Sequence, residues 1–492
     1  MENQNKRRDL EWRVALRSKI KNKERTDIGR VKMPEMDPQV RVLYQDREVN
    51  MGLDAACAQT EASRCMDCVN PTCMEGCPVS IDIPTFIKYI EQGDMLQAAR
   101  TLKETSALPA VCGRVCPQEK QCEASCFYTL KLKKEPVAIG YLERFAADFE
   151  RESGQISVPS VAAKNGVKVA AIGSGPASLS FAGDMIKLGY EVTVFEALHE
   201  IGGVLKYGIP EFRLPNRIVD VELENLQKMG VRFEKNFIAG KTAGFDDLKA
   251  EGYHAFFVAS GAGLPRFMNI PGENYNGILS SNEYLTRVNL MNAAKNDFDT
   301  PVLKGRNVAV VGGGNTAMDS VRTAKRLGAE RAMIVYRRSR EEMPARIEEV
   351  HHAEEEGIEF LNLTNPVAYF ADEKGRVNRM RVQRMELGEP DASGRRRPVV
   401  VEGSEYDIEV DVVVVAIGVS PNPLIPSALP DLKLTRWGTI EVNEQTMQSS
   451  IPELFAGGDI VRGGATVILA MGDGRRAAAG MHKYLMERAF QS

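Results

Sequence analysis

The chain has 492 residues, which at about 100–200 residues per domain predicts about three domains. It carries 63 Lys and Arg against 67 Asp and Glu, a net charge of −4, and this balance argues against a nucleic-acid-binding protein. The first 32 residues are locally basic, and we expect them to form a solvated or partner-facing arm. The longest apolar run, residues 412–419, is far shorter than the roughly 20 residues of a membrane span. The N-terminus has no apolar stretch typical of a secretory signal, so we expect a cytoplasmic protein without a membrane span.

The nine cysteines all lie between residues 57 and 126. A disulfide framework is not expected in a reducing cytosol, so this clustering predicts metal ligation. Eight of the cysteines form two sets: Cys65, Cys68, Cys73 and Cys77, then Cys112, Cys116, Cys122 and Cys126. Eight thiolates suit two iron–sulfur clusters or two structural zinc ions, and the nucleotide motifs that follow favour iron.

The Cys-Pro pair that ends the first set is typical of bacterial two-cluster ferredoxins, in which the last cysteine of the run serves the other cluster. By this analogy Cys65, Cys68 and Cys73 share one cluster with Cys126, and Cys77 joins Cys116 and Cys122. A simple division of the cysteines into two sequential groups of four uses the same atoms and stays open. Cys57 fits neither set, and we expect it to be a small buried apolar residue.

Residues 1–155 show helical spacing, for example over residues 83–99, and little strand signal. The polar segment 151–166 is typical of a linker. A β-branched run over 167–172, a glycine turn, a helical stretch and a second strand over 191–195 then predict a β-α-β unit.

The glycine turn of this unit contains the residues Gly173, Gly175, Pro176 and Ser178. A dinucleotide pyrophosphate needs a tight turn and close access to backbone N–H groups at a helix N-terminus. Ser178 stands where glycine or alanine is usual, but serine is still small enough for the helix to pack on the strand. Glu196 ends the second strand and is placed to accept hydrogen bonds from the ribose.

A second unit of the same kind follows, with strands over 307–311 and 331–336 and a helix over 315–327. Its turn contains Gly312, Gly314, Asn315, Thr316 and Ala317. Arg337 and Arg338 replace the carboxylate after its second strand. Because arginine pairs with a 2′-phosphate that a carboxylate would repel, the unit is predicted to bind NADP(H). The alternative is that these arginines only solvate the end of the strand.

Several further segments accompany the two units. The apolar runs 255–261 and 412–418 are expected to be strands where the chain crosses between the two nucleotide domains. Residues 365–407 are expected to form a hairpin and loop. His351 and His352 are expected on the solvated face of a charged helix. We assign to the flavin the glycine-rich segments that contain Gly202, Gly203, Leu205, Gly458 and Asp459, with Asp459 on a ribityl hydroxyl and the helix 465–485 aimed at the flavin.

In combination, the two cysteine sets and the motifs GSGPAS, GGVLKYGIPEFRLP, GGGNTAMD, YRRSREEMPA, AIGVSPN and AGGD resemble one family. It is the small (beta) subunit family of NADPH-dependent glutamate synthase, related to modules of dihydropyrimidine dehydrogenase and ferredoxin–NADP transhydrogenases. The resemblance implies an α/β fold with two Rossmann-like domains, for FAD and NADPH, the second inserted in the first, after an α-helical domain with two [4Fe–4S] clusters. The implied boundaries are 1–155 for the helical domain, 156–263 and 416–492 for the FAD domain, and 264–415 for the NADPH domain.

The resemblance also bears on individual residues. In some relatives a non-cysteine residue completes the second cluster, and the matching residue here is Glu143, which would leave Cys112 beside the cluster as a non-ligand. Which of the two residues binds stays open. Gly418 and Thr466 are added to the cofactor-binding positions.

The implied activity is hydride transfer from NADPH to FAD, followed by single-electron transfer through the clusters to an FMN on a large (alpha) subunit. That subunit forms glutamate from 2-oxoglutarate and glutamine. Hydride transfer needs juxtaposition more than acid–base groups, so no catalytic side chain is assigned. The alternatives are the electron-input subunit of another NADPH-linked complex, of the transhydrogenase or sulfide dehydrogenase type, and a non-enzymatic scaffold stabilised by zinc.

Overall fold

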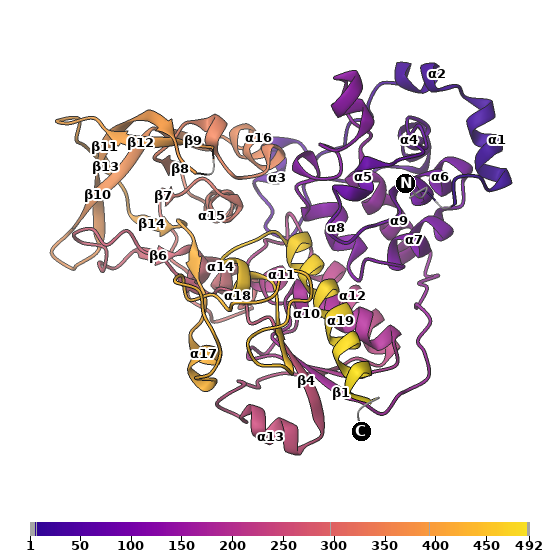
Figure 1. Ribbon diagram of the computed structural model, residues 1–492. Helices are drawn as coiled ribbons and strands as arrows, with labels where there is room; N and C mark the ends of the chain where they lie inside the picture. Colours follow the sequence, from indigo (N-terminus) through magenta and orange to yellow (C-terminus); the bar gives the residue numbers. More distant parts are fainter. Residues whose placement is uncertain (1–4, 6, 296, 393, 490–492) are drawn as a thin grey trace.

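The fold was analysed in a computed structural model, which describes residues 5, 7–295, 297–392 and 394–489. Figure 1 shows three parts: a helical N-terminal part in indigo and purple, a first sheet region at the bottom of the view, and a second, orange region opposite the helices. No helix among these residues is long and apolar enough to cross a membrane.

The N-terminal part contains helices and no regular strand among its described residues. The α-helices are α1 (Glu11–Lys19), α2 (Asn22–Asp27), α3 (Pro38–Arg41), α4 (Ala55–Ser63), α5 (Thr72–Glu75), α6 (Ile83–Gln92), α7 (Met95–Lys103), α8 (Pro109–Val115) and α9 (Ile139–Glu152). A 3-10 turn, η1 (Gln118–Lys120), and a π-helical turn, η2 (Tyr128–Leu132), complete it. The helical stretch predicted over residues 83–99 is two helices, because Gly93 turns left-handed at φ 97° and Asp94 caps the N-terminus of α7.

The first parallel sheet has the strand order β16-β4-β1-β2-β3. Its strands are β1 (Lys168–Ile172), β2 (Glu191–Phe195), β3 (Arg232–Glu234), β4 (Tyr253–Val258) and β16 (Leu454–Ala456). The helices that accompany it are α10 (Pro176–Lys187), α11 (Val204–Tyr207), α12 (Asn216–Met229), α13 (Phe245–Ala250), α17 (Leu424–Ala428), α18 (Asp459–Arg462) and α19 (Val467–Ala489). The central strands are buried on both faces, which explains their continuous apolar sequences.

The second parallel sheet has the order β6-β14-β7-β8-β9. Its strands are β6 (Ile278–Ser280), β7 (Asn307–Val311), β8 (Arg331–Tyr336), β9 (Glu359–Asn362) and β14 (Val412–Val415), with helices α14 (Ser281–Asn289), α15 (Asn315–Arg326) and α16 (Ile347–Glu355) and the 3-10 turn η3 (Arg340–Glu342). The predicted hairpin region is an antiparallel sheet of β10 (Thr364–Ala371), β11 (Val377–Pro390), β12 (Arg396–Val400) and β13 (Tyr406–Glu409).

The second sheet is inserted in the first. The first sheet takes strands from residues 168–258 and then recovers β16 from residues 454–456, after the whole second sheet has been formed. The two crossing segments lie side by side, because β5 (Leu264–Pro265) pairs antiparallel with β15 (Val419–Ser420). The predicted fold class, two dinucleotide-type units with the second inserted in the first, is confirmed.

The basic N-terminal arm is not solvated as predicted, although residues 1–4 and 6 lie outside the described residues. Arg13 is fully buried and forms an ion pair with the buried carboxylate of Asp67. Arg25 is also fully buried and donates to the carbonyl oxygens of Leu16 and Ser63. The prediction for this part of the arm was wrong because charge counting cannot show that these arginines have buried partners.

A buried ion network joins the three parts of the molecule, and Glu356 lies at its centre. Its carboxylate oxygens lie 2.9 Å from Arg41 Nε of α3 in the N-terminal part, 2.8 Å from Arg322 Nη2 and 2.7 Å from Arg326 Nη1. Glu349 extends the network, since it pairs with Arg322 and lies 3.0 Å from Arg213 Nε of the first sheet region. The network therefore holds the second sheet region against both of its neighbours.

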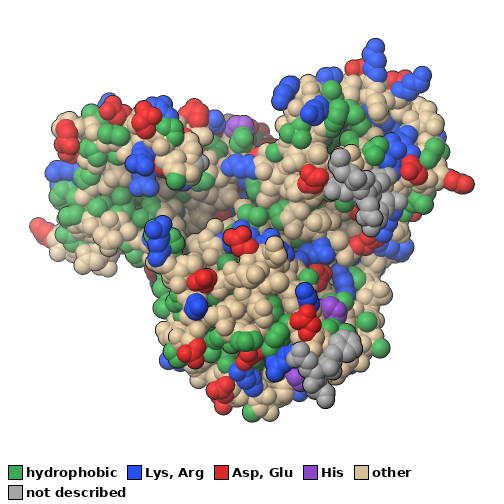
Figure 2. Space-filling model, in the orientation of Figure 1, with side chains coloured by type: hydrophobic (Ala, Val, Ile, Leu, Met, Phe, Trp, Pro, Cys, Tyr) green, Lys and Arg blue, Asp and Glu red, His purple; other side chains and the backbone are tan. Residues whose placement is uncertain are grey.

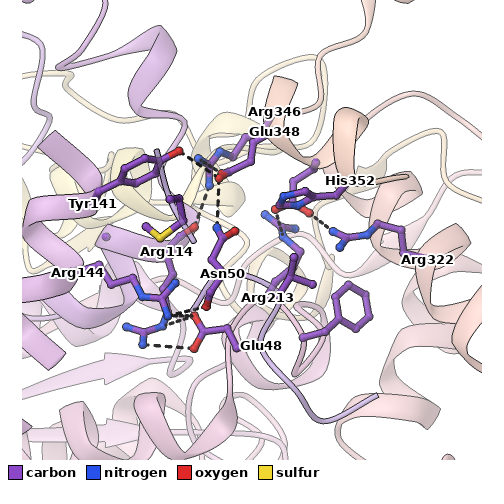
Figure 3. Close-up of a pocket in the computed structure, with 15 residues that line it drawn as sticks. Glu48, Asn50, Arg114, Tyr141, Arg144, Arg213, Arg322, Arg346, Glu348 and His352 are labelled. Carbon is purple, nitrogen blue, oxygen red and sulfur yellow. Dashed lines mark hydrogen bonds and ion pairs between the residues drawn. The ribbon is translucent and has the colours of Figure 1, made fainter. Parts of the chain in front are cut away.

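Figure 3 shows the small pocket beside this network. Arg346 reaches from the second sheet region to the N-terminal part, where it donates to the carbonyl oxygen of Arg114 at 2.8 Å and to Gln118 Oε1 at 3.0 Å. His352 also lines the pocket. It was predicted to be solvated, but it is buried, and its Nε2 lies 3.1 Å from Glu35 of the N-terminal part. The prediction for His352 was wrong because α16 packs its charged face against another part of the chain.

We predict that Glu356→Gln lowers the free energy of unfolding by about 3–5 kcal/mol, because it leaves buried guanidinium groups without their counter-charge. Burial opposes ionisation of Glu356, but Arg322 and Arg326 outweigh it and hold its pKa below the ordinary value of 4.5. The ionised carboxylate therefore stabilises the fold above pH 4.5, and the wild-type protein loses this contribution as the pH falls further. Chemical unfolding at a series of pH values measures both effects. The control is Glu359→Gln, which breaks a half-exposed pair with Arg331 and should cost less than about 1 kcal/mol. Equal losses in the two variants would contradict the prediction.

Candidate functional site

The first glycine turn lies at the carboxyl end of β1 and leads into α10. Gly173 has φ 92°, and a Cβ at this position would lie 2.5 Å from the carbonyl oxygen of Ala259, so only glycine fits. Gly175 is the N-cap residue of α10, and a Cβ there would meet nothing within 4 Å. Pro176 occupies the first turn of the helix, where its missing N–H costs nothing. The turn therefore presents open space at a helix N-terminus, as a pyrophosphate requires.

Glu196 ends β2 beside this turn, as predicted, and the structure adds one residue that the sequence did not indicate. Ser174 donates through Oγ to Glu196 Oε2 at 2.6 Å, and its backbone N–H donates to the same oxygen at 2.9 Å. Ser174 Oγ also accepts the N–H of Gly202 at 2.9 Å. Ser174 thus links the turn, the carboxylate of Glu196 and the segment of Gly202 and Gly203. A serine between two turn glycines carries no local signal of these contacts.

The other residues predicted for the flavin divide into two groups. Gly203 has φ 55°, and a Cβ on it would lie 3.1 Å from Gly175 Cα, so this segment closes over the turn. Gly458 has φ 73° and faces Ala177 of α10. In contrast, Leu205 and Ser178 are fully buried, so their side chains pack in the interior.

The C-terminal segment brings Asp459 and α19 to the same place. Asp459 Oδ1 accepts the N–H of Ala465 at 2.8 Å, and burial raises the pKa of this carboxyl to about 6. Thr466 directly precedes α19. The sequence analysis missed Asp473, which is fully buried and accepts the N–H of Gly458 at 3.0 Å while pairing with Arg462. Asp473 therefore fixes the conformation of the predicted flavin-binding loop.

The second glycine turn repeats the geometry of the first. Gly312 has φ 144°, and a Cβ on it would lie 2.3 Å from the carbonyl oxygen of Ala416. Gly314 is the N-cap residue of α15, and Asn315 Oδ1 accepts the backbone N–H of Arg346 at 2.9 Å. Thr316 is exposed and Ala317 is buried. Gly418 follows β14 at the same edge of the sheet, exposed and at φ 113°.

The two arginines predicted to select NADP(H) have different surroundings. Arg337 is exposed at the end of β8. Arg338 is buried, and its Nη2 lies 2.6 Å from Asp391 Oδ2 in the antiparallel sheet. Arg338 already has a carboxylate partner, so Arg337 is the arginine of this pair that is accessible to a 2′-phosphate.

The eight cysteines of the two sequence sets are free thiols and fall into two spatial groups. The surface group consists of Cys65, Cys68, Cys73 and Cys126, which line one cavity. Its members come from both sequence sets, as the ferredoxin analogy predicts. Burial and the nearby thiols of Cys65 and Cys126 raise the pKa of Cys68 to about 12, so the free thiols resist ionisation. Four converging thiols in an apolar wall need a cationic centre to ionise, which is the chemistry of a cluster site.

The buried group consists of Cys77, Cys112, Cys116, Cys122 and Glu143, which lie close enough to influence one another's pKa. Burial raises the pKa of Glu143 to about 8, and its Oε1 is buried without a hydrogen-bond partner among the described residues. Cys112 Sγ lies 3.4 Å from Met471 Sδ of α19. Glu143 is therefore a buried polar group that lacks a partner, whereas Cys112 already contacts the neighbouring helix.

Cys57 belongs to neither group. It is half-buried in α4 and packs against the core with one side only, so its predicted burial is incomplete.

Comparison with known proteins gives the class of the chain. Residues 43–155 match the family described as dihydropyrimidine dehydrogenase domain II, 4Fe-4S cluster. Residues 167–474 match the pyridine nucleotide-disulphide oxidoreductase family. The chain is therefore an NADPH-dependent flavin oxidoreductase of that class with an iron–sulfur domain at its N-terminal side, and the zinc alternative is not supported.

Two curated relatives that match over most of this chain identify the family within this class. The chain is 36% identical to the glutamate synthase (NADPH) small chain of Azospirillum brasilense over 464 residues, covering 93% of this chain and 95% of the relative. It is 36% identical to the corresponding chain of Escherichia coli K12 over 465 residues, covering 93% and 98%. The chain belongs to the family of NADPH-dependent glutamate synthase small chains.

One solved structure supports the fold alone. FprA of Mycobacterium tuberculosis, in complex with NADPH, matches with a TM-score of 0.56 at 21% identity, covering 66% of this chain and 86% of that one.

We predict that Ser174→Ala lowers the free energy of unfolding by about 1–3 kcal/mol and raises the dissociation constant for FAD, because Glu196 loses a charge-assisted hydrogen bond. Thermal unfolding and FAD titration of the apoprotein measure the two effects. The control is Ser178→Ala in the same turn, whose buried Oγ has no hydrogen-bond partner among the described residues. The interpretation of Ser174 would be wrong if the two variants lost FAD equally.

Proposed function

We propose that the chain is the NADPH-oxidising electron-input subunit of a glutamate synthase. Bound FAD and clusters would convert a two-electron hydride from NADPH into single electrons for an FMN on a large subunit. The observation that carries this proposal is the presence, in one chain of this family, of two glycine turns at sheet edges and two spatial groups of cysteines. Such a subunit would act in the cytoplasm with its large (alpha) partner.

The proposed binding residues follow from the geometry. The turn of Gly173 and Gly175 with Glu196 would hold FAD, and the turn of Gly312 and Gly314 would hold NADPH. The surface group would hold one [4Fe–4S] cluster and the buried group a second. The proposed domain boundaries remain 1–155, 156–263, 264–415 and 416–492.

We further propose that Glu143, rather than Cys112, completes the buried cluster. Its carboxylate is buried, faces the cysteines of this group and has an unpartnered oxygen, which a metal ligand bond would satisfy.

A second candidate function is electron input to another NADPH-linked complex, of the transhydrogenase or sulfide dehydrogenase type. One relative favours it: the beta subunit of an NADP(+)-dependent formate dehydrogenase of Moorella thermoacetica is 39% identical over 444 residues, which cover 85% of this chain and 60% of the relative. Copurification with a large glutamine-hydrolysing subunit would decide for glutamate synthase.

Anaerobic titration of purified protein tests the proposed function. We expect iron, sulfide and flavin to be present, and we expect NADPH to bleach the flavin far more effectively than NADH.

Arg337→Gln should raise the KM for NADPH by about tenfold or more and leave the KM for NADH unchanged, because the 2′-phosphate loses its ionic partner. The control is Arg340→Gln, since Arg340 already pairs with Glu354 at 2.6 Å. Bleaching of the flavin by NADH but not by NADPH would show that Arg337 does not select NADPH.

Substitution at the buried group tests the ligand assignment. We predict that Glu143→Ala lowers the iron and sulfide content and changes the electron paramagnetic resonance spectrum of the reduced protein. Cys112→Ser should keep both, because Cys112 contacts Met471 and is not needed as a ligand. Loss of iron in Cys112→Ser with full iron in Glu143→Ala would assign the ligand to the cysteine.

A further inference from the structure

A short segment after Cys126 projects apolar and basic side chains from the iron–sulfur part. Cys126 is followed by the π-helical turn η2, and Lys133 ends that turn in the left-handed region at φ 54°. Phe127 and Leu130 are 39% and 44% exposed, although both are large hydrophobic residues. A π-helical turn is rare and frequently lies at a functional site, so this segment is a candidate surface for interaction.

These apolar side chains lie beside the surface group of cysteines. Phe127 lines the same cavity as Cys68 and Cys126. Val69 directly follows Cys68 and is 49% exposed. Residues next to two of the four thiols therefore form an exposed apolar rim. Electron transfer to another protein requires a close approach to the redox centre, and this rim borders the cavity that the surface group lines.

The two cysteine groups differ in burial. In the surface group Cys65, Cys68 and Cys73 are half-buried and Cys126 is buried. In the other group Cys112, Cys116 and Cys122 are buried and Cys77 is half-buried. The buried group also faces inward. A Cβ on Gly472 of α19 would lie 2.9 Å from the carbonyl oxygen of Pro78, so the turn after Cys77 packs directly on the flavin-side helix. The exit toward a partner is therefore at the surface group.

The rim is surrounded by lysines. Lys131 and Lys133 are exposed in and after the π-helical turn, and Lys134 donates to the carbonyl oxygen of Thr26 at 2.8 Å. This contact places α2 beside the segment and brings the exposed residues Lys21 and Lys23 to the same side. The exposed acidic residues of the two segments are fewer: Glu24, Asp27 and Glu135. In Figure 2 the outer end of this lobe shows blue side chains around a green patch.

We propose that this surface, made by Val69, Phe127, Leu130 and the lysines of residues 21–23 and 131–134, docks the acidic face of an electron-accepting protein. The apolar rim excludes water at the point of contact, and the lysines steer and orient the partner by charge complementarity. The proposal rests on the proposed function, because it names the docking chemistry of the electron-accepting partner. It commits to a partner with a negative docking face.

Binding to a probe protein tests the surface independently of NADPH. The probe is an acidic [2Fe–2S] ferredoxin, oxidised, and its dissociation constant from the full-length holoprotein is measured at several salt concentrations. Lys131→Glu with Lys133→Glu should raise that constant by about tenfold at low salt and flatten its salt dependence, because rim charges govern steering. Leu130→Ser should weaken binding without changing the salt dependence.

The control is Lys164→Glu with Lys483→Glu, the same charge change on exposed lysines of the first sheet region. It should bind ferredoxin like the wild type. Iron content and unfolding midpoint show whether each variant is folded, and flavin bleaching by NADPH is followed separately, so failure of the proposed function is seen without the probe.

Two results would overturn the docking proposal. One is equal ferredoxin binding and equal salt dependence in the wild type and the Lys131/Lys133 double variant. The other is a dimeric wild type that the double variant converts to a monomer with ferredoxin binding unchanged, which would make this surface a contact between two copies of the chain. Stronger binding of a basic cytochrome c by the double variant, with weaker binding of ferredoxin, would support the proposal.

Discussion

The buried pairing of arginines with Glu356 and Glu349 is the interaction on which the arrangement of the molecule depends. Each partner by itself is costly to remove from water, and the pairs repay that cost only while every charge has its counterpart. Arg41 comes from the N-terminal part, Arg213 from the first sheet region and Arg322 from the second. Moving one part relative to the others would separate these pairs and leave buried charges without a counter-charge. Because the ion pairs join the two sheet regions, they also fix the position of one glycine turn relative to the other.

Helix α19 is the second element that fixes distances. Gly472 and Gly474 lie two residues apart, so they face opposite sides of the helix. A Cβ on Gly472 would meet the carbonyl oxygen of Pro78, and one on Gly474 would lie 2.2 Å from the carbonyl oxygen of Ala177 in α10. Arg475 reinforces both contacts, because it donates to the carbonyl oxygen of Val79 and pairs with Asp184 of α10 at 2.9 Å. One helix, with glycine on two faces, thus separates the cysteine region from the first glycine turn.

The sequence predicted those features that depend on local pattern. The strands over 191–195, 307–311 and 331–336 and the glycine turns were located correctly, because each is specified by its own sequence. The apolar runs 255–261 and 412–418 were also strands, but β4 and β14 end three residues earlier. The interleaved cysteine grouping was predicted from the Cys-Pro pair. Ser174, Asp473 and the network around Glu356 were not predicted, since their partners lie far away in the chain. His352 and Arg13 were placed in solvent for the same reason: a charged sequence does not reveal that another part of the chain covers it.

These constraints together arrange the first glycine turn, the buried cysteine group and the surface cysteine group in a fixed order. The second sheet region is held by ion pairs against both neighbours, which keeps the two nucleotide turns in one fixed relation. The buried cysteine group packs on α19, next to the flavin turn, and the surface group lies beyond it at an exposed apolar rim. Burial therefore decreases from the flavin side to the outside. In the proposed function, an electron that left the flavin for the cysteines would move toward the surface group, and the lysines beside that group would favour an acidic approaching surface.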